Sequence, residues 1–213
     1  MKLKKIASLA LAGVMAVSML AGCKTGSSSS SSSSEVVPTG MVAAVINNLD
    51  NETTDKVAFT ASTTLENALE SLISYAGMNA NDTSKVTVAN LKKFDAALST
   101  DETFGTLNNK SSEETSITGM VKLNSNDIGA SDAYIANQLA DLIDAEKVYE
   151  STSTWNALPE FSKDFKDSDG NTCYYDFDYT GEIAVVSVTD AQTGRTTYVV
   201  AYTVTMTPAK VEK

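Results

Sequence analysis

The chain has 213 residues, of which 27 are acidic, 16 are basic and none is histidine, so its net charge is −11. Without histidine, Ser-His-Asp and Cys-His catalysis, HExxH metalloproteases and imidazole-bound zinc are excluded. The acidic balance argues against nucleic acid as a partner, because phosphates would be repelled. The sequence also has no GxxxxGK[ST] or GxGxxG motif, and we expect no bound cofactor.

The first 22 residues have the pattern of an export signal. Three lysines within residues 1–5 precede an apolar run over 6–20, which is shorter than the roughly 20 apolar residues that span a bilayer. The run ends in the tetrapeptide Leu20-Ala21-Gly22-Cys23. An ordinary secretory signal or a short anchor is the alternative, but ordinary cleavage favours a small residue where leucine stands.

This segment resembles the signal peptide and lipobox of bacterial lipoproteins. The resemblance implies that residues 1–22 are removed and that Cys23 carries a diacylglyceryl thioether. It also implies a location at the cell membrane, lipid-anchored and facing the extracytoplasmic side. Two acyl chains hold such an anchor stably, whereas one holds it marginally.

Residues 23–38 contain the cysteine and an unbroken serine run from Ser27 to Ser34. With almost no apolar surface to bury, this stretch is predicted to be a flexible tether. Its r.m.s. reach of roughly 20 Å exceeds the Debye length of about 8 Å at physiological salt. Losing the three N-terminal lysines makes the mature charge about −14. The tether lets salt screen the repulsion between that charge and anionic headgroups.

Residues 39–213 have the length of one ordinary domain, and we expect it to be monomeric. A short strand is predicted over 56–60. The Thr63/Glu66 spacing of a capping box then predicts a helix that ends at Gly77. A second helix is predicted over 88–98 and a third after the N-cap Ser131.

The remaining patterns are those of β-structure. Alternation over 117–123 predicts a strand, and the C-terminal third predicts a long hairpin whose loop covers 190–195. Residues 172–189 are compatible with one bent strand or with two strands joined at Thr180-Gly181. Val186 and Val188 make both faces apolar there, which indicates cover on both sides. The fold class is therefore α+β, with about three helices packed on an antiparallel sheet.

Two residues near the hairpin are interpreted as core residues. Trp155 is expected to fill the core rather than to stack on a ligand. Cys173 has no partner within the chain once Cys23 is lipidated, and its strand-like setting beside two tyrosines favours a buried, inert thiol over intermolecular pairing.

An acidic turn offers a weak candidate for calcium. Carboxylate and amide oxygens are the ligands that calcium prefers. The spacing departs from an EF-hand loop, because Gly170 is fourth rather than sixth and the twelfth residue is aspartate rather than glutamate. A tight turn at Gly170 is the favoured interpretation. The candidate ligands are Asp167, Asp169, Asn171 and Asp178.

The C-terminal aromatic residues also allow two interpretations. They form either a sugar-stacking platform or, as is more common at period two, a packed core face. Arg195, the chain's one arginine, follows turn residues and is interpreted as a solvated loop charge. The aromatic residues concerned are Tyr174, Tyr175, Phe177, Tyr179, Tyr198 and Tyr202.

Two classes of function follow. The leading hypothesis is a non-enzymatic, lipid-anchored binding or interaction domain with an unknown protein or glycan partner. The alternative is a small cell-envelope hydrolase that uses carboxylates or a Ser-Lys pair. Facing carboxylates in a deep cleft would favour the enzyme, and a flat or grooved exposed apolar patch would favour binding. No catalytic residue is identified from the sequence.

Overall fold

A computed structural model of the chain describes residues 40–77, 82–107, 112–125, 130–150 and 152–213. The expected lipidation site and the expected tether lie outside these residues. Within them, the fold is α+β: helices cover a five-stranded mixed sheet whose C-terminal part is a long hairpin. None of the described helices combines the length and the apolar character needed to cross a membrane.

The hairpin forms the centre of the sheet. Its strands are β4 (Thr172–Thr189) and β5 (Thr196–Glu212), paired antiparallel from Cys173↔Glu212 to Thr189↔Thr196. Residues 172–189 are thus one strand, and pairing continues through Gly181 without interruption. This resolves the question that the alternation pattern left open.

Three shorter strands extend the sheet. On β5 lies β2 (Thr115–Ser125), antiparallel, as expected from the 117–123 pattern. On the other side of β4 lie β3 (Phe165–Lys166), antiparallel, and β1 (Ala58–Ala61), parallel. Because β1 is parallel to β4, the sheet is mixed. After β1 the chain passes through α3 and α4 before it joins the sheet again at β2.

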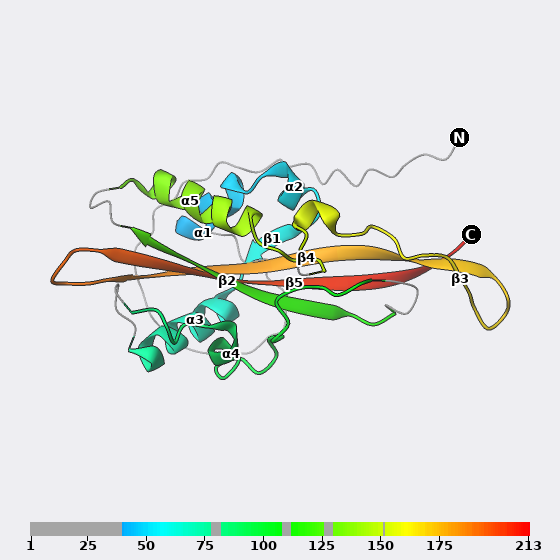
Figure 1. Cartoon of the computed structure of the whole chain (residues 1–213), viewed down its shortest axis with the longest axis horizontal. Helices are drawn as coiled ribbons and strands as arrows, with labels where there is room; N and C mark the ends of the chain where they lie inside the picture. The colour runs from blue at the N-terminus through cyan, green and yellow to red at the C-terminus, as the bar shows by residue number, and fades with distance from the viewer. Residues whose placement is uncertain (1–39, 78–81, 108–111, 126–129, 151) are drawn as a thin grey trace, which may run out of the picture. The chain divides into compact units, whose positions relative to one another are not determined.

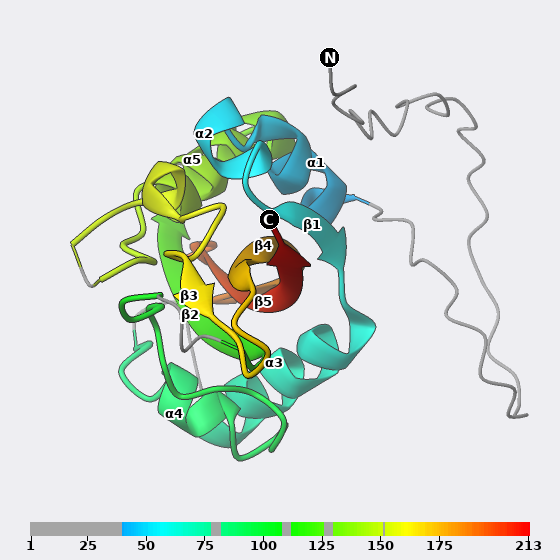
Figure 2. The same ribbon diagram turned by 90° about the vertical axis from the view of Figure 1, so that its right-hand side faces the viewer.

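The helices pack on both faces of the sheet (Figures 1 and 2). One face carries α1 (Met41–Asn48), α2 (Asn51–Thr54) and α5 (Asp132–Asp144), and the other carries α3 (Thr63–Ala76) and α4 (Val88–Leu91). A 3₁₀ turn, η1 (Trp155–Ala157), leads into β3. The first two helices are too short to give a clear period in the sequence and were not predicted.

The predicted cap of α3 is wrong by one residue. The helix begins at Thr63 as predicted, but the side chain of Ser62, not that of Thr63, accepts the N–H of Leu65 as the cap. The predicted C-terminus is confirmed, because Gly77 takes the left-handed conformation at φ 60°. Ser131 is confirmed as the N-cap of α5, where it accepts the N–H of Tyr134.

The predicted helix over 88–98 begins at Val88 as expected, but its predicted length is wrong, because α4 ends at Leu91. Turns follow it, and the side chain of Asp95 accepts the N–H of Ala97. Such a local bond gives the backbone an alternative to helical pairing. Leu91 and Leu98 are buried all the same, so the apolar spacing reflects the core rather than one continuous helix.

Two apolar clusters, one on each face, hold the layers together. Trp155 is confirmed as a core residue: it is 1% exposed and donates its indole N–H to the carbonyl of Ile143 at 2.8 Å. On the other face, Leu69 and Leu72 of α3 pack with Val199 of β5. Val186 and Val188 pack against this second cluster and Val185 packs against the first, so the predicted cover on both sides is confirmed at 185–186, whereas Ser187 and Thr189 are exposed.

Two glycines within the strands make room for aromatic rings. A Cβ at Gly119 would overlap the ring of Tyr202, its partner across β2 and β5, and one at Gly181 would overlap Phe59. Tyr202 therefore lies across β2, and its ring reaches Trp155 at 5.6 Å between centroids. These positions need glycine for space rather than for a special φ.

Candidate functional site

One part of the hairpin surface carries no helix. The helix α3 packs on Ala184, Val199 and Ala201, but on the same side of the sheet the part of β4 and β5 nearest the C-terminus extends beyond α3 and α4 (Figure 1). Its side chains follow from the register of the two strands. We name as the open face the residues Tyr174, Asp176, Asp178, Thr180, Glu182, Thr203, Thr205 and Thr207, together with Ser116 of β2 and Phe161.

An exposed aromatic pair lies at one end of the open face. Phe161 bridges to Asp176 and therefore shares its side of the sheet. Its ring is 54% exposed and meets the ring of Tyr174 edge-on, with 5.7 Å between centroids. Ser162, the next residue, holds this segment on β4 through two bonds of 2.8 Å with the backbone of Tyr175.

Carboxylates follow the aromatic pair along β4. Asp176, Asp178 and Glu182 alternate with core residues and therefore point to the open face. Burial raises the pKa of Asp176, and the negative charges of Asp178 and Glu160 raise it further. In the described structure, the side chains of Asp178 and Glu182 take part in no ion pair and no hydrogen bond. The open face is therefore locally negative.

Three lysines near the open face have anionic partners, whereas Lys166 donates to the hydroxyl of Thr172. Lys56 pairs with Glu160 at 2.9 Å, and Lys210 pairs with Asp167 at 2.8 Å. Lys213 pairs with Asp164 at 2.6 Å, and its Nζ lies 5.7 Å from the centre of the Tyr174 ring. These ammonium groups offset charge beside the face, and they leave the carboxylates of β4 uncompensated.

Hydroxyl groups fill the rest of the open face. Those of Ser116 and Thr205 bond to each other at 2.8 Å, and Thr207 donates to Glu114 at 3.3 Å. The hydroxyl groups of Thr180 and Thr203 have no hydrogen-bond partner in the described residues. The surface thus offers donors and acceptors beside an aromatic pair, an arrangement that suits binding rather than bond cleavage.

The predicted aromatic platform is divided between core and surface. Phe177, Tyr179 and Tyr202 are buried, and Tyr198 packs against the same core cluster. Tyr175 stacks on Phe165 at 5.0 Å on the opposite side of the sheet from Tyr174. Only Tyr174 of the predicted residues reaches the open face. Its neighbour Phe161 was missed, because it precedes the alternating strand and has no periodic signal.

The four candidate calcium ligands do not converge. Asp167 accepts the backbone N–H groups of Asp169 and Asn171, as in an aspartate turn, and Gly170 has the positive φ of 85°. The ammonium of Lys210 holds the pKa of Asp167 down to about 2 and occupies the place a cation would take. Asp178 belongs to the open face, whereas Cys173, which contacts Asp167, points to the other side. Within the described residues no group of three acidic or thiol side chains could hold a metal.

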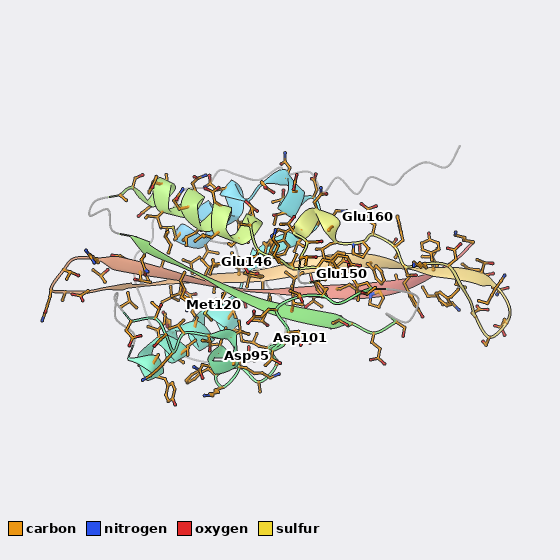
Figure 3. The ribbon with its side chains drawn as sticks, in the orientation of Figure 1. Asp95, Asp101, Met120, Glu146, Glu150 and Glu160 are labelled. Atoms are coloured by element: carbon orange, nitrogen blue, oxygen red, sulfur yellow. The ribbon has the colours of Figure 1, made fainter. Side chains whose placement is uncertain are left out.

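A second acidic site lies at the C-terminal end of α5, on the other face of the sheet (Figure 3). Burial raises the pKa of Glu146, the charge of Glu102 adds to the shift, and a hydrogen bond from the Tyr202 hydroxyl opposes it. Tyr202 reaches this carboxylate by lying across Gly119. Paired backbone bonds join the two loops, from Phe104 to Val148 and from Glu150 to Phe104. We name Glu102 and Glu146 the Glu146 pair. No sequence pattern indicates it, because the two residues are far apart along the chain.

The remaining candidates from the sequence are a Ser-Lys pair, Cys173 and Arg195. No hydrogen bond within the described residues joins a serine hydroxyl to a lysine ammonium. Cys173 is buried, and burial raises the pKa of its thiol, with the Asp167 carboxylate adding to the shift. A thiol in that state is a poor nucleophile, which agrees with the inert role expected for it. Arg195 lies exposed in the hairpin loop, as predicted.

Similarity to other proteins identifies no further site residue. Comparisons with protein-family models, with curated proteins and with solved structures found no match. The open face and the Glu146 pair are therefore judged on their geometry. The open face combines exposure, aromatic surface and unpaired polar groups in one continuous area.

Proposed function

We propose that the protein is a non-enzymatic binding domain, anchored by lipid on Cys23 and facing the extracytoplasmic side. The open face is its ligand-binding surface. The observation that carries the binding role is Phe161, a large aromatic side chain more than half exposed, on the same face as Asp178, Thr180 and Glu182, whose side chains have no partner among the described residues. The lipobox resemblance supports the anchor, and the serine run would separate the domain from the headgroups.

The anchor is tested by metabolic labelling of the full chain with an alkyne fatty acid in a bacterial host. We expect label on the wild type and on Cys173→Ser, and none on Cys23→Ala. Cys173 is the matched control because it is the other cysteine of the chain and is buried. Equal labelling of Cys23→Ala and wild type would contradict the anchor.

The binding role is tested with the full-length Cys23→Ala variant, which removes lipid attachment from the measurement. We expect it to sediment with isolated cell envelopes and expect Phe161→Ala to weaken sedimentation. Tyr75→Ala is the matched control, because Tyr75 is 65% exposed on α3, away from the open face. Equal sedimentation of the Phe161 and Tyr75 variants would reject the open face as the binding surface.

A cell-envelope hydrolase is the second candidate, and the Glu146 pair is the observation that favours it. A carboxyl whose pKa is raised beside a second carboxylate is suited to general acid catalysis. Glu146→Gln keeps an oxygen that accepts from Tyr202 but removes the proton donor. Hydrolysis of wall polysaccharide by the wild type, lost in this variant, would establish the enzyme. Equal hydrolysis by the two would remove Glu146 from that role.

A further inference from the structure

We infer that the open face binds a neutral, linear polysaccharide lying along β4. The inference rests on the proposed function, since it names the class of ligand for the same surface. It is carried by three features of that surface: its uncompensated negative charge, its supply of both donors and acceptors, and the aromatic pair at one end.

The charge of the open face excludes anionic ligands. Asp176, Asp178 and Glu182 lie on it, and three lysines near its margins are held in ion pairs with Glu160, Asp164 and Asp167. A phosphate or carboxylate group would meet the like charges of these three carboxylates. The net charge of −11 adds repulsion at longer range. The ligand is therefore neutral or cationic.

The hydroxyl groups favour a neutral polyol over a cation. A cation uses acceptors only, whereas Thr180 and Thr203 also present O–H donors without partners in the described residues. A sugar hydroxyl donates to a carboxylate, in a charge-assisted bond, and accepts from a threonine. Carboxylates and threonines face each other across the strands here, as the pairs Asp178↔Thr207 and Glu182↔Thr203 show.

The aromatic pair also favours a sugar. The C–H groups of a pyranose ring pack on an exposed aromatic face, which buries apolar area without needing charge. One side of Tyr174 is already approached by the Lys213 ammonium, so Phe161 supplies the free aromatic surface.

The spacing of the polar groups indicates a chain rather than a single sugar. Same-side residues recur about every 6.8 Å along a strand, so the row from Tyr174 to Glu182 is several sugar units long.

The test is a pull-down and affinity electrophoresis with the full chain in a detergent that has no sugar headgroup. The neutral probes are chitin beads, soluble xylan and a soluble β-glucan, with polylysine as the cationic probe and alginate as the anionic one. The variants are Phe161→Ala and Asp178→Asn, with Tyr75→Ala as control. Circular dichroism confirms that each variant is folded, and Asp178→Asn keeps the test valid should Phe161→Ala be unfolded.

We expect the wild type to bind at least one neutral glycan, with the same affinity at low and at high salt. Tyr75→Ala should bind that glycan as tightly as the wild type does. Phe161→Ala should bind it about tenfold more weakly, because the aromatic packing is lost. Asp178→Asn should bind more weakly than the wild type, since a charge-assisted acceptor becomes a neutral one.

Two results would overturn the inference. The first result is that the protein binds none of the neutral probes. The second is that it binds polylysine alone and that this binding weakens as salt is added. Either result rejects a neutral glycan as the ligand. If Phe161-dependent binding to envelopes persists in that case, the proposed binding role stands with another ligand. If Phe161→Ala changes neither glycan nor envelope binding, the open face loses both roles.

Discussion

The β4–β5 hairpin has two halves that share the same strands and differ in what covers them. The covered half, residues 183–186 and 199–202, has helices on both sides, and the four residues of β5 in it are at most 1% exposed. The open half, residues 172–182 and 203–212, alternates buried and exposed positions along β4, as Phe177, Asp178 and Tyr179 illustrate. A continuous apolar run thus marks two-sided cover, and alternation marks a surface facing water.

This difference separates stability from function. In the covered half the side chains are committed to packing, and Tyr202 contacts both Phe59 and Trp155. In the open half one side of the sheet carries the core and the other carries polar groups that packing does not use. Substitutions in the first region should therefore change folding, and those on the open face should change binding alone.

The largest effect is expected for Trp155→Ala in the aromatic cluster over the covered half. Removing this buried indole leaves a cavity beside Phe59 and Tyr202 and strands the carbonyl of Ile143. We expect the free energy of unfolding to fall by about 4 kcal/mol, measured by urea denaturation. Trp155→Phe should lower the free energy of unfolding by clearly less, because most of the apolar volume of the side chain remains. A loss below about 1.5 kcal/mol for the alanine variant would contradict the role of Trp155 as the centre of the core.

A smaller loss of stability is expected for Gly119→Ala. The new Cβ would overlap the Tyr202 ring, and either the ring or β2 must move. Overpacking of this kind costs about 1–3 kcal/mol. Gly105→Ala is the control, since a Cβ there meets nothing within 4 Å and its φ is not positive. If both variants unfold at the same urea concentration, Tyr202 does not depend on the glycine.

The sequence predicted the covered half better than the open half. Alternation and turn residues predicted the hairpin, and apolar stripes predicted α3 and α5, because packing imposes a period on the sequence. The stop of α4 at Leu91 and the cap at Ser62 depend on single hydrogen bonds, which spacing alone does not reveal.

The candidate site was predicted only in part. Tyr174 was among the aromatic residues considered, but Phe161 and Glu146 come from irregular segments that tertiary pairing brings to the sheet. The acidic turn was predicted correctly as a turn at Gly170, whereas the contact of Asp167 with Lys210 joins residues 43 apart in the chain. Such contacts have no local signature, and their absence from the sequence pattern left calcium open as a hypothesis.

The ion pair of Lys210 and Asp167 gives a pH test at the end of the open half. The pKa of Asp167, held to about 2, lies below its unfolded value, so the pair stabilises the fold above about pH 4 and ceases to do so as the pH falls toward 2. In Lys210→Gln the pKa of Asp167, followed by NMR titration, should rise. The stability difference from the wild type should shrink over the same pH range.

Lys213→Gln is the matched control for this pH test. It removes an ion pair with Asp164 rather than with Asp167. The pKa of Asp167 should therefore stay near 2 in this variant. An equal rise in both variants would show that overall charge, and not the direct contact, sets the pKa.

The smallest effect on stability is expected for Phe161→Ala, which tests whether the open face is free of the core. Phe161 is 54% exposed, and its described ring contact is with Tyr174, so we expect a change within about 0.5 kcal/mol. Phe59→Ala is the comparison, because that ring is 9% exposed and meets Trp155 and Tyr202, so its loss should cost about 3–5 kcal/mol. Urea denaturation of the two variants measures the contrast. A Phe161 variant as unstable as the Phe59 variant would mean that Phe161 holds the 158–166 segment on β4 instead of serving a ligand.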